Sequence, residues 1–255
     1  MNGVARPCRR AILPSVSSLD PDILLRAYSV GVFPMADSRQ APDIYWVEPR
    51  KRGIMPLDGF HLSRSLAKVI RSGRFRVTVD HGFAEVVRAC AEATADRPDT
   101  WINSAIERAY ADLHRRGHAH SVECWQDGQL VGGLYGVRLG AAFFGESMFS
   151  RTRDASKVAL AWLVARLRAG GFALLDCQFI TEHLASLGAV EISRDHYAML
   201  LDSAVGNSPR RGGAPRPEAD FFALEARAAE AGLDPHAIPG RFITSLLADG
   251  ASTRG

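Results

Sequence analysis

The sequence predicts an α+β fold. Three consecutive strand-like stretches are separated by turns, as in an antiparallel meander. A helix that is apolar nearly all round then runs to residue 168, and an apolar strand follows it. With 47% hydrophobic and 23% charged residues among 255, the chain has an ordinary globular composition and can bury a sizeable core. A meander, a buried helix and a further strand together indicate a sheet covered by helices.

Residues 1–56 are rich in proline and irregular, and we expect them to form a small N-terminal α+β domain. A short helix is predicted over 21–29, because Asp20 can cap it and a proline stands at its first position. The chain is expected to turn at 33–35, and 45–47 is typical of a short strand.

Regular periodicity predicts a second domain over 57–204. Asp127 and Gly128 form a strong hairpin-turn signal between two of its strands, and Gly117 is expected to end a helix. The expected helices are 63–70, 82–93, 103–116, 154–168 and 181–187, and the expected strands are 75–79, 118–125, 129–137, 141–149 and 173–179.

Residues 205–255 are predicted to be a linker and a C-terminal extension. The stretch 206–218 is rich in glycine, proline and arginine, a composition typical of a flexible linker. The segment after it carries a helix-like stretch and the apolar residues 242, 243, 246 and 247. We therefore expect the extension to pack back on the core.

The meander, the buried helix and the next strand resemble the GNAT acyltransferase fold, so we expect 57–204 to be a GNAT-like domain. Acyl-CoA enzymes of this fold hold the donor's pyrophosphate with the backbone N–H groups of a glycine-containing loop and the helix start after it. The corresponding stretch here, 150–156, contains no glycine. The sequence therefore disfavours acyl-CoA as the donor.

Basic residues gather between 50 and 76, where a single acid, Asp58, accompanies them. Such an excess is suited to phosphate contacts, although a solvated helix face gives the same pattern. The basic residues are Arg50, Lys51, Arg52, Arg64, Lys68, Arg71, Arg74 and Arg76.

The remaining composition favours a cytoplasmic protein. The four cysteines are isolated, with no metal or redox spacing, as is usual for reduced thiols. The apolar stretch 11–13 is too short for a signal peptide, and no run approaches the roughly 20 apolar residues of a membrane span. We expect no membrane association.

Polar residues inside two predicted strands indicate a site. Glu146 lies in an aromatic strand, where a carboxylate is costly to bury without partners, and the preceding Gly145 suggests a bulge. Asp176 and Gln178, two apart in a strand, share one face and suggest a polar pocket. An outward-facing carboxylate and a solvated strand end remain the alternatives.

Two further groups favour ordinary packing when taken alone. His118 and His120 share a strand face, but no third metal ligand is evident nearby, so we expect no metal site. Trp101 and Tyr110 can stack on a nucleobase, yet aromatic residues more often fill a core.

An ordered set of segments between about residues 24 and 200 resembles the leucyl/phenylalanyl-tRNA–protein transferase family. Each segment is weak by itself, whereas their order along the chain is highly specific. The segments are Ala27-Tyr28, Gly31-Val32-Phe33-Pro34, Phe60-His61-Leu62-Ser63-Arg64-Ser65, Thr100-Trp101-Ile102, Gly117-His118-Ala119-His120-Ser121-Val122-Glu123, Leu130-Val131-Gly132-Gly133-Leu134-Tyr135-Gly136-Val137, Phe144-Gly145-Glu146-Ser147-Met148-Phe149-Ser150, Ala155-Ser156-Lys157, Asp176-Cys177-Gln178 and Ala185-Ser186-Leu187-Gly188-Ala189.

The resemblance implies an aminoacyltransferase that moves Leu or Phe, less often Met, from aminoacyl-tRNA to the N-terminal amino group of proteins. It implies acceptors beginning with Arg or Lys, which are thereby marked for degradation, and no cofactor. We expect a monomer.

The resemblance also assigns roles to individual residues. It places Glu146, Asp176 and Gln178 at the catalytic centre, and Trp101 and Tyr110 at the aminoacyl-tRNA site. The expected side-chain pocket consists of Leu134, Phe143, Leu163, Leu167 and Leu175, and the expected tRNA phosphate contacts are Lys68, Arg71, Arg74 and Arg76.

This chain departs from the family pattern in two places. Met35 stands where many members carry a tryptophan, which puts base stacking there in doubt. Leu163 and Leu167 replace aromatic residues of some members, so the pocket size can differ.

The expected mechanism needs no strong base, because the donor is an activated ester and the α-amino group has a pKa of about 7.7–8.0. We expect Gln178 to accept a hydrogen bond from the attacking amine and Asp176 to polarise the Gln178 amide. Glu146 or Asp176 would suit a cationic acceptor. The competing interpretations are an acyl-CoA N-acyltransferase and an RNA-binding module with an inactive transferase fold.

Overall fold

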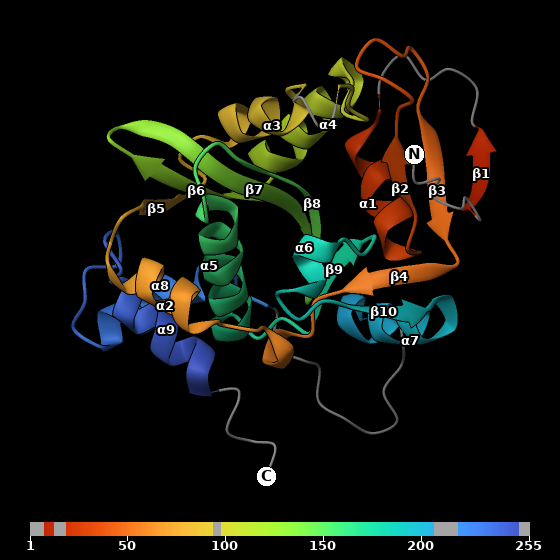
Figure 1. The fold of residues 1–255 in the computed structure, drawn as a ribbon. Coiled ribbons are helices and arrows are strands. Elements are labelled where there is room, and N and C mark those ends of the chain that lie inside the picture. Colours follow the sequence, from red (N-terminus) through yellow and green to blue (C-terminus); the bar gives the residue numbers. More distant parts are fainter. Residues whose placement is uncertain (1–7, 13–18, 94–97, 207–218, 250–255) are drawn as a thin grey trace.

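The computed structural model describes residues 8–12, 19–93, 98–206 and 219–249. A seven-stranded mixed sheet, in the order β10-β4-β9-β8-β7-β6-β5, carries helices on both faces, and a three-stranded sheet β1-β3-β2 lies beside it (Figure 1). This confirms the α+β class, whereas the likeness to the GNAT fold stays a prediction. The strands are β1 (Cys8–Ile12), β2 (Phe33–Met35), β3 (Tyr45–Pro49), β4 (Lys51–Ile54), β5 (Arg76–Val79), β6 (Ala119–Gln126), β7 (Gln129–Leu139), β8 (Ala142–Ser150), β9 (Leu174–Gln178) and β10 (Val190–Ser193).

Each helix predicted up to residue 187 is present within a few residues of its expected bounds, whereas η1 and α7 were not predicted. Side-chain caps fix several starts, because a polar oxygen satisfies a free backbone N–H of the first turn. Asp20 caps α1, Ser63 caps α2 and Asn103 caps α4. The helices are α1 (Pro21–Ser29), η1 (Leu57–Gly59), α2 (Arg64–Arg71), α3 (Phe83–Ala91), α4 (Ser104–Arg115), α5 (Ala155–Ala169), α6 (Glu182–Ala185), α7 (Arg194–Val205), α8 (Ala223–Glu230) and α9 (Gly240–Asp249).

The centre of the large sheet is the predicted meander. Strands β6, β7 and β8 pair antiparallel in sequence order. The buried helix α5 then crosses over, so that β9 pairs with β8 in parallel, with Phe143 opposite Leu175. This crossover brings the chain of Asp176 beside that of Glu146.

Strand β4 was not predicted, because its sequence Lys-Arg-Gly-Ile has neither alternation nor an apolar run. It pairs antiparallel with β9 on one side and with β10 on the other. The insertion of β4 places Arg52, which the sequence grouped with the surface basic residues, inside the protein, where only 1% of it is exposed.

The N-terminal segment also contains an element that was not predicted. Residues 33–35, expected to turn, form β2 and pair with β3, with Phe33 opposite Val47. Pro34 fits there because β2 lies at the edge of its sheet, where a residue without N–H breaks no ladder. The boundaries between domains at residues 56 and 204 stay predictions.

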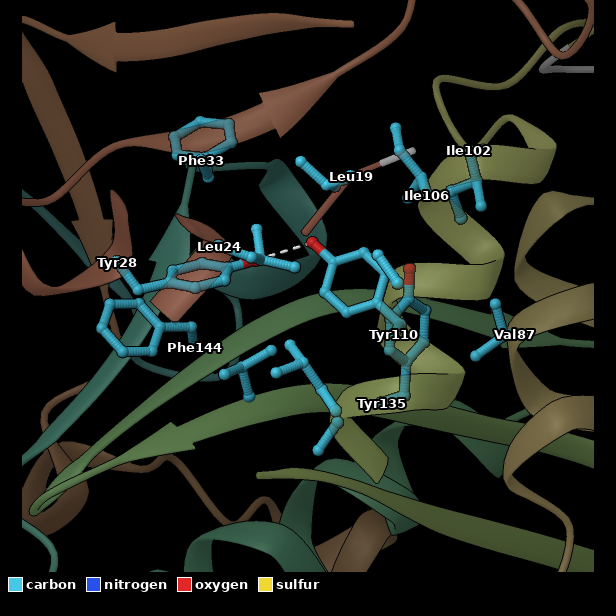
Figure 2. Packing of buried hydrophobic residues seen from close by; sticks show 14 of the residues in the cluster. Leu19, Leu24, Tyr28, Phe33, Val87, Ile102, Ile106, Tyr110, Tyr135 and Phe144 are labelled. Carbon is cyan, nitrogen blue, oxygen red and sulfur yellow. Dashed lines mark hydrogen bonds between the residues drawn. The ribbon is translucent and has the colours of Figure 1, made fainter. Parts of the chain in front are cut away.

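Two hydrophobic cores lie on opposite faces of the large sheet. The first packs α1, α3 and α4 against β7 and β8, and Figure 2 shows Tyr28, Tyr110 and Tyr135 within it. The second surrounds α5 and includes Ile243 and Leu247 of α9. The C-terminal segment from 219 to 249 therefore packs back on the core. The expected linker at 206–218 lies outside the described residues except for Gly206. Over the described parts of the chain, no helix has both the length and the apolarity that a membrane span requires.

Candidate active site

Glu146 is the extra residue of a β-bulge. Tyr135 of β7 pairs with Ser147 and Gly136 pairs with Gly145, so Glu146 has no partner across the β7–β8 ladder. The bulge that Gly145 suggested is therefore present. It turns the Glu146 side chain away from regular alternation and lets it meet residues from three other elements.

Two buried tyrosines and an amide hold the Glu146 carboxyl group. Tyr28 of α1 lies 2.6 Å from Oε1, Tyr110 of α4 lies 2.8 Å from Oε2, and Gln178 Nε2 donates to Oε1 at 3.1 Å. The two tyrosine hydroxyls are also 2.6 Å apart, the contact drawn in Figure 2. The three side chains make three oxygen–oxygen contacts, and each contact needs one proton to be a hydrogen bond. The two tyrosine hydroxyls supply two protons, so the third must come from a protonated Glu146 carboxyl group.

Burial raises the pKa of Glu146 to about 7, even though the hydrogen bonds from Tyr28 and Tyr110 lower it. Burial also raises the pKa of both tyrosines well above 10, so their hydroxyls stay protonated. Near neutral pH, Glu146 is therefore divided between its acid and its base form and can exchange a proton with a bound group.

We expect Glu146 to make the protein less stable as the pH rises from 5 to 8. Its pKa is raised from 4.5 in the unfolded chain to about 7, so the stability it contributes is fully present below 4.5 and is lost as the pH passes 7. A shift of this size corresponds to about 3 kcal/mol, and we reduce this to ~1–2 kcal/mol because Glu146 is only partly buried.

Urea unfolding at pH 5 and pH 8 measures this change in the free energy of unfolding. The variant Glu146→Gln should show a smaller drop over the same interval, because it removes this titration alone. An identical drop in wild type and variant would contradict the raised pKa.

Asp176 is buried and is bound by a different set of groups. The Nε and Nη2 atoms of Arg52 donate to its carboxylate at 2.8 and 2.6 Å, and the Tyr197 hydroxyl donates at 2.7 Å. The backbone N–H of Gln178 donates to Oδ1 at 2.8 Å. The expected contact between Asp176 and the Gln178 amide side chain is therefore wrong, because that amide donates to Glu146.

A cavity of about 290 Å³ opens beside Glu146 and Gln178. Of the five residues expected to form the aminoacyl pocket, Leu134, Leu163 and Leu175 line it. Unpredicted parts of the wall come from β8, α5 and the segment of α6. The complete lining is Leu134, Tyr135, Gly145, Glu146, Ser147, Met148, Leu160, Leu163, Leu175, Cys177, Gln178, Phe179, Thr181, His183 and Leu184.

Phe143 and Leu167 do not line this cavity. Phe143 is fully buried and stacks on Phe221, with ring centroids 5.5 Å apart. Leu167 lies one turn beyond Leu163 on α5, deeper in the core. On α5 the cavity meets Leu160 and Leu163, which lie nearer the N-terminus of the helix than Leu167. The roles expected for Phe143 and Leu167 stay predictions.

The other expected site residues are dispersed. Tyr110 belongs to the hydrogen-bonded centre, whereas Trp101 is half-buried against the first core and does not line the cavity. The four expected phosphate contacts are exposed; two lie on α2, one precedes β5 and one begins it. They are Lys68, Arg71, Arg74 and Arg76.

His120 contacts a carboxylate and an aromatic ring. Its Nδ1 lies 2.7 Å from Asp80 Oδ2, and its ring stacks on Phe221. Among the residues that the structure describes, no group of three or more His, Cys, Asp or Glu side chains is placed to hold a metal ion.

Three residues of the centre were not identified from the sequence. Tyr28 was seen only as part of a motif, Arg52 was counted as a surface charge, and Tyr197 gave no signal. Each contacts a residue far away in the chain; the Arg52–Asp176 pair, for example, spans 124 positions.

Comparison with known proteins gives the following similarities. The model of the family described as leucyl/phenylalanyl-tRNA protein transferase matches residues 54–202, and the model of that protein's N-terminal domain matches 17–50. Relatives named leucyl/phenylalanyl-tRNA–protein transferase include one from Rhizorhabdus wittichii, 76% identical over 191 residues, which are 75% of this chain and 77% of the relative. Another, from Zymomonas mobilis, is 66% identical over 189 residues, 74% of this chain and 70% of the relative.

Two solved structures show weaker similarity. The crystal structure of FemX aligns with a TM-score of 0.44 and 14% identity, covering 68% of this chain and 66% of FemX. The structure of L-PGS from Bacillus licheniformis aligns with a TM-score of 0.37 and 13% identity, covering 65% of this chain and 54% of L-PGS.

Proposed function

Because this chain belongs to the leucyl/phenylalanyl-tRNA–protein transferase family, an aminoacyltransferase family that uses aminoacyl-tRNA, we propose that it transfers Leu or Phe, less often Met, to proteins beginning with Arg or Lys. The transferred residue would mark the acceptor for degradation. We further propose that it acts in the cytoplasm as a monomer and without a cofactor.

The cavity is the observation that carries this proposal. Its wall is mostly apolar and consists largely of leucines and Met148. The polar pair Glu146–Gln178 borders it, together with Ser147, Thr181 and His183. An apolar cavity with a few polar groups at one point is suited to an apolar side chain whose reacting end must be oriented. About 290 Å³ is sufficient for a leucine or phenylalanine side chain.

The contacts of Gln178 support a role in orienting the attacking amine. Its Nε2 donates to Glu146, so its amide oxygen remains available to accept an N–H from the acceptor's α-amino group. The amine nitrogen attacks the ester carbonyl, a C–N bond forms, and the C–O bond to the tRNA ribose breaks. Glu146 accepts the amine proton, which finally passes to the ribose oxygen of the leaving tRNA.

Glu146, rather than Asp176, is the carboxylate suited to contact the cationic acceptor. Four donors already occupy the Asp176 oxygens, whereas Glu146 borders the cavity. An ionised carboxylate that is only partly enclosed can form a charge-assisted hydrogen bond with the new substrate.

The test is transfer from Leu-tRNA to a peptide with N-terminal Arg, measured by the mass of the product peptide. Peptides beginning with Lys should also react, and one beginning with Glu should not. RNase treatment should abolish transfer, and acetyl-CoA should not replace the donor. Acetyl transfer would support the acyl-CoA interpretation, and tRNA binding without any transfer would support an inactive RNA-binding protein.

Enlarging one residue of the cavity wall should narrow donor choice. We expect Leu175→Phe to reduce transfer of Phe more than transfer of Leu, by about fivefold, because added volume excludes the larger side chain first. Competition between Phe-tRNA and Leu-tRNA measures the ratio. The control is Leu167→Phe, which overpacks the core without reaching the cavity. It should lower stability and leave the ratio of Phe transfer to Leu transfer unchanged. If the ratio is unchanged in both variants, Leu175 is a core residue with no part in donor choice.

The exposed basic stretch should govern tRNA affinity. Replacing Arg71 and Arg74 by Glu is expected to weaken binding at least tenfold and to flatten the slope of log K against log salt, since fewer phosphate counterions are released. Filter binding at several salt concentrations measures both quantities. The control is the same charge change at the exposed Arg26 and Arg108. Equal losses of tRNA affinity in the two double variants would exclude a specific phosphate-binding surface at 64–76.

A further inference from the structure

The carboxylate of Asp176 has no free hydrogen-bonding position. Arg52 Nε and the Gln178 backbone N–H donate to Oδ1, and Arg52 Nη2 and the Tyr197 hydroxyl donate to Oδ2. A carboxylate accepts about four hydrogen bonds in its plane, so these donors fill it. Asp176 itself is 0% exposed. Asp176 is therefore not placed to take a proton or to touch a substrate.

Arg52 is fixed as firmly as the carboxylate it binds. Its Nη1 donates to the carbonyl oxygen of Gly31 at 2.9 Å. Its guanidinium lies between the rings of Phe33 and Tyr197, at 4.7 and 4.5 Å from their centroids. The Asp176 carboxylate is thus held by Arg52 of β4 and Tyr197 of α7, and the segment after α1 fixes Arg52 in turn. All three segments lie outside the meander.

Asp176 acts on Gln178 through the backbone. The Gln178 N–H bonded to Oδ1 belongs to a residue with φ of 54°, in the left-handed region that residues other than glycine rarely adopt. Such a conformation persists only where the surroundings hold it in place. It ends β9 at this point and lets the Gln178 amide reach Glu146.

We propose that Arg52 and Tyr197 are positioning residues for the transfer reaction. They hold Asp176 as a fixed anchor, the anchor holds the left-handed backbone of Gln178, and that backbone aims the amide at the attacking amine. The proposal rests on the role given to Gln178 in the proposed function. It assigns to Asp176 a structural task in place of proton transfer or polarisation of the Gln178 side chain.

A second buried arginine offers a matched control. Arg166 is also 1% exposed; it binds Glu225 with both terminal nitrogens and the carbonyl oxygen of Phe221, and it lies over the Phe221 ring. None of these residues lines the cavity. Lysine keeps the positive charge at either position, but it cannot reproduce the hydrogen bonds that the planar guanidinium group of arginine donates from several nitrogen atoms.

The experiment compares Arg52→Lys, Arg166→Lys and Tyr197→Phe with the wild type, using Leu-tRNA and a peptide with N-terminal Arg. Assays are run well below the melting temperature of each variant. We expect Arg52→Lys to lower kcat at least tenfold, Tyr197→Phe to lower it several-fold, and Arg166→Lys to change it less than twofold, because small misplacement of an orienting group is costly. KM for Leu-tRNA should stay within about twofold in all three variants, as expected when only a transition-state contact is lost.

Hydrogen exchange across 174–180 gives a second readout that needs no acceptor. The Gln178 amide should exchange faster in Arg52→Lys than in the wild type and should be unchanged in Arg166→Lys. Equal kcat losses in the two lysine variants, or unchanged exchange in Arg52→Lys, would overturn the proposal. A wild type that leaves the Arg peptide unmodified would refute the proposed acceptor, while the exchange data would still decide the positioning role.

Discussion

The variant Gln178→Ala is expected to keep its fold and to lose about 100-fold in kcat, which corresponds to about 3 kcal/mol in the activation barrier. The substitution removes the amide oxygen that we propose as the acceptor of the amine's N–H, while Cβ and the backbone contact to Asp176 remain. Raising the pH to 9 should not restore the rate, because the α-amino group is already largely neutral there and the defect is one of position. Steady-state transfer from Leu-tRNA between pH 6 and 9 measures this.

A double-mutant cycle with Glu146→Gln shows whether the two side chains act together. Because Glu146 holds the Gln178 amide at 3.1 Å, the two losses should not add, and the double variant should be little slower than the slower single variant. If the losses in kcat are strictly additive, Gln178 and Glu146 contribute to the reaction independently of each other. Recovery at high pH would instead mean that Gln178 mainly assists proton removal.

Asp176→Asn is expected to lower the free energy of unfolding by about 3–5 kcal/mol, the usual cost of leaving one member of a buried ion pair alone. One carboxylate oxygen would become an NH₂ group, a donor that faces the donors of Arg52 or Tyr197 and cannot accept their hydrogen bonds. The Arg52 side chain is only 2% exposed, so water cannot replace the lost acceptor. Urea unfolding monitored by tryptophan fluorescence measures the change.

The control for this experiment is Glu225→Gln. Glu225 pairs with the equally buried Arg166, but its own side chain is 26% exposed, so water can solvate the pair after the charge is removed. We expect a loss of about 1 kcal/mol there, as for more exposed ion pairs. A similarly small loss in Asp176→Asn would show that the buried pair contributes little, and it would also weaken the case for Asp176 as an anchor.

The sequence determined the elements whose signals are local. Helix caps at Asp20, Ser63 and Asn103, the Asp127-Gly128 turn and the apolar helix α5 depend on neighbours a few positions away, and each is present. The ordered motifs also determined the family, because their order along the chain is a property of the sequence itself. Glu146 was noticed for the same reason: a carboxylate after glycine in an aromatic strand is a local anomaly.

The tertiary structure alone decided what these residues contact. Strand β4 could not be predicted because its sequence lacks periodicity. It becomes a strand by pairing with β9 and β10, and this pairing buries Arg52. The cavity wall was likewise undecided, since Leu163 and Leu167 are equally apolar on one helix and only the first meets open space. A sequence records which side chains are apolar or charged, but burial and ion pairing are relations between segments. Asp176 binds Arg52 and the Gln178 backbone, and not the Gln178 side chain, because folding brought Arg52 beside it from 124 positions away.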